Sequence, residues 1–203
     1  MAQVALIGAS GDAGSRILAE LSHRGHQVTA IARHTDKIAT LPGVTPKQGD
    51  ANDQQALGAL LKGHDAVISA VPFSASDVKK LVGAVRDSGV ARYLVVGGAG
   101  SLEVAPGEKV IDQPDFPEAY KPEASAGGEF LDFLRGVNDL EWTFLSPSAE
   151  FVPGERTGVF RLGQDELLTH GAGSSISFED YAVALVDELE KPRHMNQRFT
   201  VGY

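Results

Sequence analysis

The amino-acid sequence predicts an α/β fold in which a parallel sheet is covered by helices on both faces. Two observations carry this prediction. Short β-branched apolar runs alternate with longer stretches of helical periodicity, and most of the short runs are apolar throughout rather than at every second residue. A strand that is apolar on both sides is buried on both sides, which is typical of a parallel sheet between two helical layers. Right-handed crossovers then give a doubly wound sheet.

The first half of the chain contains five of the expected strands, joined by short connections. Glycine or proline turns separate the elements, and each helical stretch carries aliphatic residues on one face. In chain order, we expect a strand at 4–7, a helix at 11–25, strands at 28–33 and 44–48, a helix at 53–62 that Asp53 caps, a strand at 66–71, a helix at 76–88 and a strand at 93–96.

The second half of the chain is less regular. Residues 97–122 are rich in glycine and proline, and a connection of this length inside a compact domain usually serves a function. We expect a single domain over residues 1–203, in which residues 147–175 form a small C-terminal substrate lobe over the sheet edge. The other expected elements are helices at 123–134 and from Ser177 onward, and strands at 142–145, 159–162, 166–169 and 198–201.

The composition excludes several classes of function. With 18 basic and 27 acidic residues, the net charge is −9, which disfavours nucleic acid and anionic membranes as partners. There is no cysteine, and the six histidines lack the spacing of metal ligands, so we expect no metal site. No apolar run reaches the ~20 residues of a membrane span, and the N-terminus lacks a signal peptide's basic region. We therefore expect a cytoplasmic monomer or homodimer.

Three glycines between the first expected strand and the first expected helix provide the strongest indication of function. Gly8, Gly11 and Gly14 are spaced three residues apart. In dinucleotide-binding proteins the first glycine allows a sharp turn, the second lets a pyrophosphate approach the backbone, and the third lets the helix pack closely. A tight turn without a ligand is the alternative. The pattern favours a Rossmann fold, with the phosphates bound by Gly8, Ser10, Gly11, Asp12, Ala13 and Gly14.

The end of the second expected strand indicates which dinucleotide is bound. NAD-binding proteins carry an acidic residue there, which binds the ribose 2′-hydroxyl. This chain has Arg33 and His34 instead, and its first carboxylate is Asp36. A guanidinium is suited to a 2′-phosphate, and His34 is suited to hydrogen bonding or to stacking on adenine. We therefore expect NADP (NADPH), with NAD as the alternative. The competing interpretation is that Arg33 is only a solvated strand-end residue.

Further cofactor contacts are expected where the later strands end. Asp50 follows the third strand, where its carboxylate is placed to accept a hydrogen bond from adenine or to cap the next helix. Small residues close the fourth and fifth strands and leave room for the riboses and the nicotinamide at the carboxyl edge of the sheet. These expected contacts are Ala70, Val71, Pro72, Gly97 and Gly98.

On these residues the chain resembles the atypical short-chain dehydrogenase/reductases. The segments 120–124, 142–147, 153–158 and 180–184 resemble more specifically the NAD(P)H-flavin reductase branch, which is related to the NmrA-like regulators and to biliverdin reductase B. The resemblance extends over essentially the whole chain. It implies an NAD(P)-binding Rossmann fold and a flavin that enters as a substrate rather than as a tightly bound group.

The sequence departs from this family at the catalytic pair. Conventional members use a tyrosine and a lysine four residues later, but Ala124 stands four residues after Tyr120. If Glu129 is taken as the anchor of the helix, the two positions fall on Lys121 and Ser125, which do not match either. Tyr120 and Lys121 are the candidate catalytic residues. A flavin accepts a hydride directly and does not need the pair, so its absence favours a flavin or quinone acceptor.

Three further residues are candidates for substrate contact. Phe73 follows the fourth strand, and Glu150 and Phe151 follow the sixth. The alternatives are core packing for Phe73 and plain surface for Glu150, and Tyr120 is either a pocket residue or a buried aromatic. We interpret the protein as an NAD(P)H-dependent oxidoreductase with a small-molecule acceptor. A dinucleotide-binding redox sensor without turnover and a sugar-type epimerase or dehydratase are the alternatives.

Overall fold

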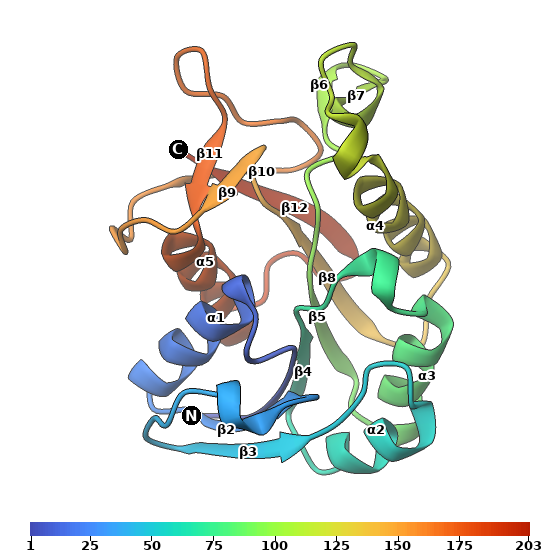
Figure 1. Ribbon diagram of the computed structural model, residues 1–203, viewed down its shortest axis with the longest axis vertical. Helices are drawn as coiled ribbons and strands as arrows, with labels where there is room; N and C mark the ends of the chain where they lie inside the picture. Colours follow the sequence, from blue (N-terminus) through green and yellow to red (C-terminus); the bar gives the residue numbers. More distant parts are fainter.

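The computed structural model describes residues 1–203 and confirms the expected fold class. Its main sheet has eight strands, and only the short edge strand β10 runs antiparallel (Figure 1). These strands are β1 (Gln3–Ile7), β2 (Gln27–Ala32), β3 (Val44–Gln48), β4 (Ala66–Ser69), β5 (Arg92–Val96), β8 (Glu141–Ser146), β10 (Arg161–Gly163) and β12 (Gln197–Gly202). Their order across the sheet is β10-β12-β8-β5-β4-β1-β2-β3. Strands β1 to β3 are added toward one edge and the later strands toward the other, so the strand order reverses between β1 and β4.

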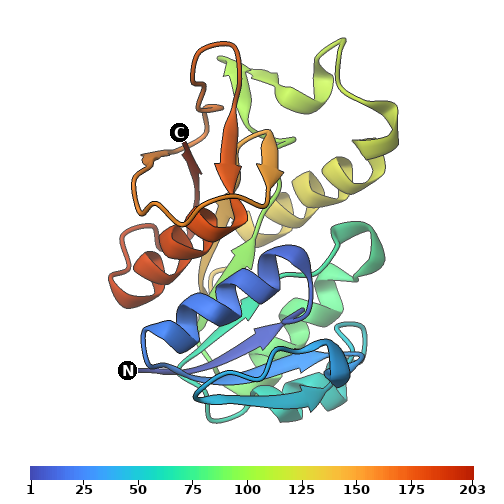
Figure 2. The ribbon, with the colours of Figure 1, turned by 60° about the vertical axis from the view of Figure 1, so that its left-hand side comes forward.

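Helices cover both faces of this sheet and create two separate apolar cores. Helices α1 (Asp12–His23) and α5 (Phe178–Glu190) pack side by side on one face (Figure 2). Helices α2 (Gln54–Leu61), α3 (Val78–Ser88) and α4 (Lys121–Arg135) cover the other face. Trp142, expected in the core, is 2% exposed and lies on the α4 side. None of these helices is both long and apolar enough to cross a membrane.

Local sequence explains where several helices begin. The Asp53 carboxylate accepts a hydrogen bond from Ala56 N and caps α2, and Ser177 caps α5 through Asp180 N, as expected. Helix α3 begins at Val78 because Asp77 caps it, which is two residues later than expected. Helix α4 begins at Lys121 rather than at residue 123, since Pro122 is favourable in a first helical turn.

The long connections contain small elements that the sequence pattern did not predict. Within residues 97–122 there is a hairpin of β6 (Glu103–Ala105) and β7 (Glu108–Lys109), and β9 (Glu150–Val152) pairs in parallel with β11 (Ser175–Ser177). The strand expected at 166–169 was wrong. Only one bridge forms there, between Glu166 and Glu103. Short 3-10 turns are η1 (Thr35–Lys37), η2 (Phe73–Ala75), η3 (Val110–Asp112) and η4 (Glu118–Tyr120).

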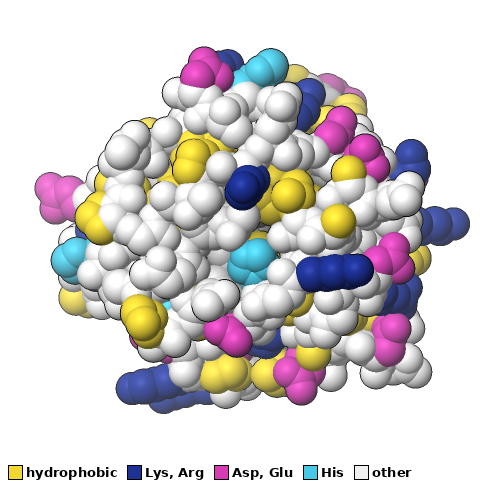
Figure 3. Space-filling model, turned by 90° about the horizontal axis from the view of Figure 1, so that it is seen from below, with side chains coloured by type: hydrophobic (Ala, Val, Ile, Leu, Met, Phe, Trp, Pro, Cys, Tyr) yellow, Lys and Arg dark blue, Asp and Glu magenta, His cyan; other side chains and the backbone are white.

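Figure 3 shows the face that is seen when the molecule of Figure 1 is viewed from below. Basic, acidic and apolar side chains are interspersed there (Figure 3). Many charged side chains pair with neighbours of opposite sign, such as Arg86 with Asp139 at 2.9 Å. This pairing restrains loops locally and contributes little to stability where both groups are exposed.

Candidate functional site

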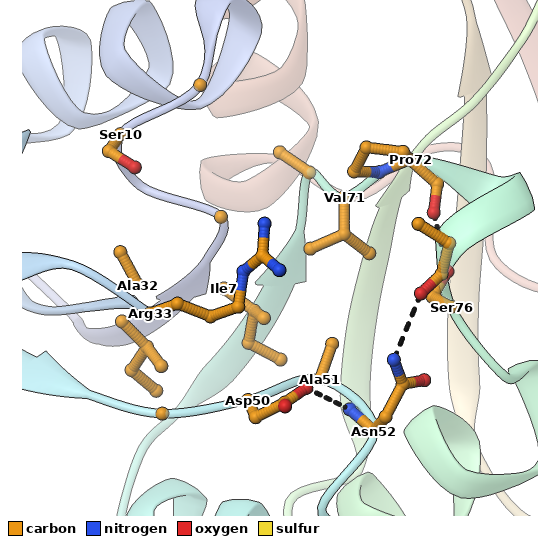
Figure 4. Close-up of a pocket in the computed structure, with 16 residues that line it drawn as sticks. Ile7, Ser10, Ala32, Arg33, Asp50, Ala51, Asn52, Val71, Pro72 and Ser76 are labelled. Atoms are coloured by element: carbon orange, nitrogen blue, oxygen red, sulfur yellow. Dashed lines mark hydrogen bonds between the residues drawn. The ribbon is translucent and has the colours of Figure 1, made fainter.

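A cavity of about 240 Å³ opens where β1, β2, β3 and β4 end, beside the N-terminus of α1 (Figure 4). This is the carboxyl edge of a doubly wound sheet, the place where such folds bind ligands. It lies where the strand order reverses between β1 and β4. The lining residues are Ile7, Gly8, Ser10, Gly11, Ile31, Ala32, Arg33, Gly49, Asp50, Ala51, Asn52, Ala70, Val71, Pro72, Ala75 and Ser76.

The structure requires glycine at Gly8 and Gly14 for different reasons, and it does not require one at Gly11. Gly8 has a φ of +84°, and a Cβ there would lie 2.2 Å from Ala70 O. A Cβ on Gly14 would lie 1.9 Å from Gly8 O, so this position fixes the close approach of α1 to the strand end. A Cβ on Gly11 would meet nothing closer than Gly8 O at 3.6 Å, so Gly11 is free of packing constraints and faces the cavity.

The N-terminus of α1 is suited to binding an anion. Its N-cap is Gly11, and no side chain accepts a hydrogen bond from the first amides of the helix. Gly11 N donates to Gly8 O, so the unpaired N–H groups are those of the first turn, Asp12, Ala13 and Gly14. Together with the positive end of the helix dipole they favour a phosphate group. The side chain of Ser10 lines the same space. Asp12, Ala13 and Gly14 form the first turn of the helix and do not line the cavity with side chains.

Arg33 is the basic residue of the cavity. It is exposed at the end of β2, and its guanidinium extends into the space between Ser10 and Val71 (Figure 4). The backbone oxygen of Arg33 accepts a hydrogen bond from Gln48 Nε2, whereas its guanidinium makes no hydrogen bond or ion pair within the protein. An unpaired guanidinium that faces a cavity is suited to a phosphate. His34 is exposed and lies outside the lining.

The loop after β3 forms the opposite wall. Asp50 Oδ1 accepts a hydrogen bond from Asn52 N at 2.8 Å, and Asp53 caps α2, so the expected alternative of a capping role for Asp50 was wrong. Sequence reasoning missed Asn52. Its amide donates to Ala75 O at 3.0 Å and accepts from Asp77 N at 2.9 Å, which fixes the segment after β4 beside the cavity. Its position just after Gly49-Asp50 at a strand end was the available indication.

The ends of β4 and β5 lie next to each other. Ala70, Val71 and Pro72 line the cavity as expected, whereas Gly97 and Gly98 lie beyond it. A Cβ on Gly97 would lie 2.4 Å from the Phe144 ring, so this glycine is required by packing. The cavity therefore corresponds to the adenosine and pyrophosphate part of the expected site, and the end of β5 lies beyond it on the side expected for the nicotinamide.

Tyr120 and Lys121 do not lie in the cavity. Tyr120 is 65% exposed at the end of η4, so it is neither a cavity residue nor a buried aromatic. Lys121 Nζ pairs with Glu118 Oε1 at 2.6 Å on the surface. The reason is the early start of α4, because Pro122 makes Tyr120 the N-cap residue and leaves its side chain in solvent. A catalytic role for these two residues stays a prediction.

The candidate substrate residues after β8 separate from one another. Glu150 is exposed on β9, and its backbone N–H donates to Ser174 O. The ring of Phe151 lies 4.5 Å from that of Phe178 and 4.8 Å from that of Tyr181, between centroids. Phe151 thus packs against the core on the α5 side of the sheet, and its expected contact with a substrate stays a prediction.

Acidic residues of α5 and α1 hold the segment 153–158 against the fold. Asp180 is fully buried and accepts hydrogen bonds from the backbone N–H groups of Thr157 and Gly158 at 2.8 Å, and from the hydroxyl of Tyr203 at 2.6 Å. Glu20, 4% exposed, accepts two hydrogen bonds from the Arg156 guanidinium at 2.7 and 2.8 Å. Those bonds hold the pKa of Glu20 below its ordinary value, although burial opposes them.

A second buried group, Arg198, joins the loop after β5, the end of β8 and the loop after β10. Its side chain is 3% exposed and donates to the Ser101 hydroxyl at 2.9 Å, to the Ser146 hydroxyl at 3.2 Å and to Asp165 at 2.9 Å. Sequence reasoning missed this contact set, because nothing local marks an arginine within a strand as the partner of three distant segments. No group of three or more acidic or histidine side chains could hold a metal ion.

Comparisons with known proteins agree with this geometry. The model of the NAD(P)H-binding family matches residues 8–192. A structure named "putative exported protein" from Burkholderia pseudomallei is 44% identical, with a TM-score of 0.91 and all of both chains covered. A structure named "putative epimerase" from Bacteroides thetaiotaomicron is 44% identical, with a TM-score of 0.94, over 99% of this chain and 96% of that one.

A third solved structure carries another name. It is a "putative NADH-flavin reductase" from Streptococcus pneumoniae, 38% identical, with a TM-score of 0.86, over 100% of this chain and 99% of that one. The three structures share the fold of this chain but have names that imply different activities. They therefore support the fold and do not identify a reaction. The family match begins at Gly8 and covers the glycine loop, the ends of β2, β3 and β4 that line the cavity, and helix α5 with Asp180. This chain belongs to the NAD(P)H-binding family.

Proposed function

We propose that this protein is an NADPH-dependent oxidoreductase that transfers a hydride to a flavin, a quinone or a similar flat acceptor. The observation that carries the proposal is the cavity at the sheet edge, which combines a glycine turn, a helix N-terminus and an unpaired guanidinium. Pyrophosphate fits the turn and the helix end, and the 2′-phosphate of NADPH fits Arg33. The name of the Streptococcus relative supports the acceptor class.

The surroundings of the site favour an acceptor that needs no proton relay. Tyr120 is in solvent, and Lys121 is paired with Glu118. Carbonyl reduction or sugar epimerisation through a tyrosine-lysine pair therefore lacks its proton donor in this arrangement. A flavin or quinone takes up a hydride directly, and water supplies the accompanying proton. The reaction then depends on how the two rings are positioned more than on acid catalysis.

Each part of the chain has a stated task in this proposal. The turn at Gly8 and the first amides of α1 bind the pyrophosphate, Asp50 faces the adenine, and Arg33 selects the 2′-phosphate. When bound, the reduced dinucleotide supplies a hydride from its nicotinamide ring. Phe73 and Gly98 lie beside the expected place of that ring, and residues 97–122 and 147–156 enclose the acceptor from above.

The experiment compares cofactor binding and turnover in wild type, Arg33→Ala and Lys37→Ala. Lys37 is an exposed cation of η1 outside the cavity lining, so its variant controls for the loss of one positive charge. We expect Arg33→Ala to weaken NADPH binding by on the order of 1.5 to 3 kcal/mol and to leave NADH binding nearly unchanged. Lys37→Ala should change neither. Equal wild-type affinities for NADPH and NADH would contradict the cofactor assignment.

Turnover is measured as NADPH oxidation with FMN, riboflavin and a small quinone. The proposal expects oxidation with at least one of these acceptors and first-order dependence on the enzyme. Tight NADPH binding without oxidation by any acceptor would contradict it, and would favour a dinucleotide-binding sensor that acts on a partner without turnover.

A further inference from the structure

Phe73 stands at the boundary between the nucleotide cavity and the end of β5. It follows Pro72 of the cavity lining, and a Cβ on Gly98 would lie 3.9 Å from Cε2 of its ring. The ring packs on Phe144, with 6.0 Å between centroids and planes inclined by 21°, and on Phe130 at 5.2 Å. Phe73 as a residue is half-buried, not enclosed by the core.

Glu123 fixes the backbone of this aromatic residue. It lies in the first turn of α4, and its two carboxylate oxygens accept separate hydrogen bonds from Phe73 N at 2.7 Å and from Ser74 N at 2.8 Å. A charge-assisted pair of this kind defines direction as well as distance. On the opposite side, Asn52 binds Ala75 O and Asp77 N, so η2 is held both from the cavity and from α4.

Gly127 provides the room for the ring. It lies one helical turn after Glu123 and is buried. A Cβ at this position would lie 3.1 Å from Cδ2 and 3.2 Å from Cε2 of Phe73, closer than ordinary van der Waals contact. The next residue, Gly128, has nothing within 4 Å of the place of its Cβ. The two glycines therefore differ in one respect that matters here, which is contact with the Phe73 ring.

We propose that Glu123 and Gly127 are positioning residues that hold the Phe73 ring as one wall of the acceptor site beside Gly98. A fixed aromatic wall favours planar π-systems such as an isoalloxazine or a quinone, because stacking on a ring that is already ordered costs little conformational entropy. The proposal rests on the proposed function for the presence of an acceptor at this edge. It adds the residues that select the acceptor's shape.

The matched glycines give a direct experiment. Protein saturated with NADP⁺ is titrated with riboflavin, and flavin fluorescence quenching gives the Kd without requiring turnover. Gly127→Ala and Gly127→Val are compared with Gly128→Ala and Gly128→Val. Alanine is a better helix former than glycine, so both alanine variants are expected to fold, which circular dichroism and Tm check.

We expect riboflavin to bind several-fold more weakly to Gly127→Ala and at least tenfold more weakly to Gly127→Val, with NADP⁺ affinity unchanged. The Gly128 variants should bind riboflavin like wild type. Equal riboflavin affinities for Gly127→Val and Gly128→Val, with both variants folded, would overturn the proposal.

A second pair of variants tests the carboxylate. Glu123→Gln keeps the shape of the side chain and replaces one acceptor oxygen with a donor that faces an N–H group. Glu129→Gln makes the same change at an exposed position of the same helix. We expect a several-fold weaker riboflavin Kd and a raised acceptor KM for Glu123→Gln only, with kcat changed less than KM. No difference between these two variants would contradict the role of Glu123.

The two proposals fail in different ways. If wild type binds riboflavin and Gly127→Val does not, but NADPH is never oxidised, the role of Phe73 is supported and the reductase proposal is contradicted. If wild type oxidises NADPH with a flavin and the Gly127 and Gly128 variants have the same riboflavin Kd, the reductase proposal is supported and the role of Gly127 and Phe73 is contradicted. If the NADP⁺-loaded protein binds neither a flavin nor a quinone, the wall is overturned.

Discussion

The two sides of the site are built in different ways. The nucleotide cavity is formed by backbone turns at the ends of neighbouring strands, and all of its lining residues lie between positions 7 and 76. The segments after β5 and β8, which the proposed function assigns to the acceptor side, are held by side chains from far along the chain, such as Arg156 on Glu20, 136 positions apart, and Arg198 on Ser101, 97 positions apart. Backbone geometry thus determines the first side, and long-range side-chain contacts determine the second.

This difference predicts the largest effect for a change within the glycine turn. Gly14→Val places atoms against Gly8 O, 1.9 Å from a Cβ, so we expect at least 3 kcal/mol loss of unfolding free energy, the range of severe core overpacking. Gly11→Val meets no close atom and has an extended backbone, with φ −75° and ψ 177°, that valine adopts readily. We expect Gly11→Val to fold and to lose NADPH binding, because its side chain enters the space expected for the pyrophosphate.

Thermal unfolding and an NADPH titration separate these two outcomes. A Gly14→Val protein as stable as wild type would contradict the packing argument. A folded Gly11→Val protein with undiminished NADPH affinity would show that the dinucleotide lies elsewhere.

The nucleotide side could be predicted from the sequence because its rules are local. Gly8 requires a positive φ, Gly14 requires close helix packing, and both needs appear as glycine at fixed spacing after an apolar run. Arg33 is recognisable because it is the residue at a strand end. Asn52 was missed although it lies in the same cavity, since its role depends on contacts with Ala75 and Asp77 that sequence spacing does not reveal.

In the segments after β8, we expect a smaller loss of unfolding free energy when a single buried carboxylate is changed. Asp180 is fully buried, and Asp180→Asn replaces one carboxylate oxygen with an NH2 group. If Oδ1 is kept for Thr157 N and Gly158 N, the hydroxyls of Thr157 and Tyr203 lose Oδ2 as their acceptor. We expect a loss of about 3 kcal/mol in unfolding free energy, or about 6–12 °C in Tm for a domain of this size. Asp187→Asn on the same helix removes a carboxylate that is 56% exposed and should cost under about 1 kcal/mol.

The same carboxylate gives a pH dependence. Burial alone would raise the pKa of Asp180, but the hydrogen bonds from Thr157, Tyr203 and Gly158 outweigh it and hold that pKa below its ordinary value. The stabilisation is therefore present above the unfolded-state pKa of about 3.9 and is lost as the pH falls through the lower pKa of the folded state. Urea unfolding from pH 7 to pH 3 should show the difference between wild type and Asp180→Asn shrinking below about pH 4. A constant difference would contradict this account.

The acceptor side could be predicted only in outline because its contacts are non-local. The helix at Ser177 and the strand at the C-terminus were expected and are present, whereas the clamp of Asp180 on residues 153–158 was not. Phe151 was expected near the substrate, and its contact with Phe178 accompanies the pairing of β9 with β11. Such pairings depend on tertiary packing, which neither periodicity nor motif spacing reports.

The smallest effect is expected at Tyr120, where the motif resemblance and the structure differ most. Tyr120→Phe removes a hydroxyl that is in solvent and keeps the ring, so steady-state NADPH oxidation with FMN, riboflavin or a quinone should fall by less than about tenfold. Lys121→Met removes a surface cation paired with Glu118 and should behave in the same way. Loss of a general acid usually costs roughly 10² to 10⁴ in rate. A loss of that size for Tyr120→Phe would mean that η4 moves on binding to bring the hydroxyl to the acceptor, and carbonyl reduction would then replace flavin reduction as the reaction to test.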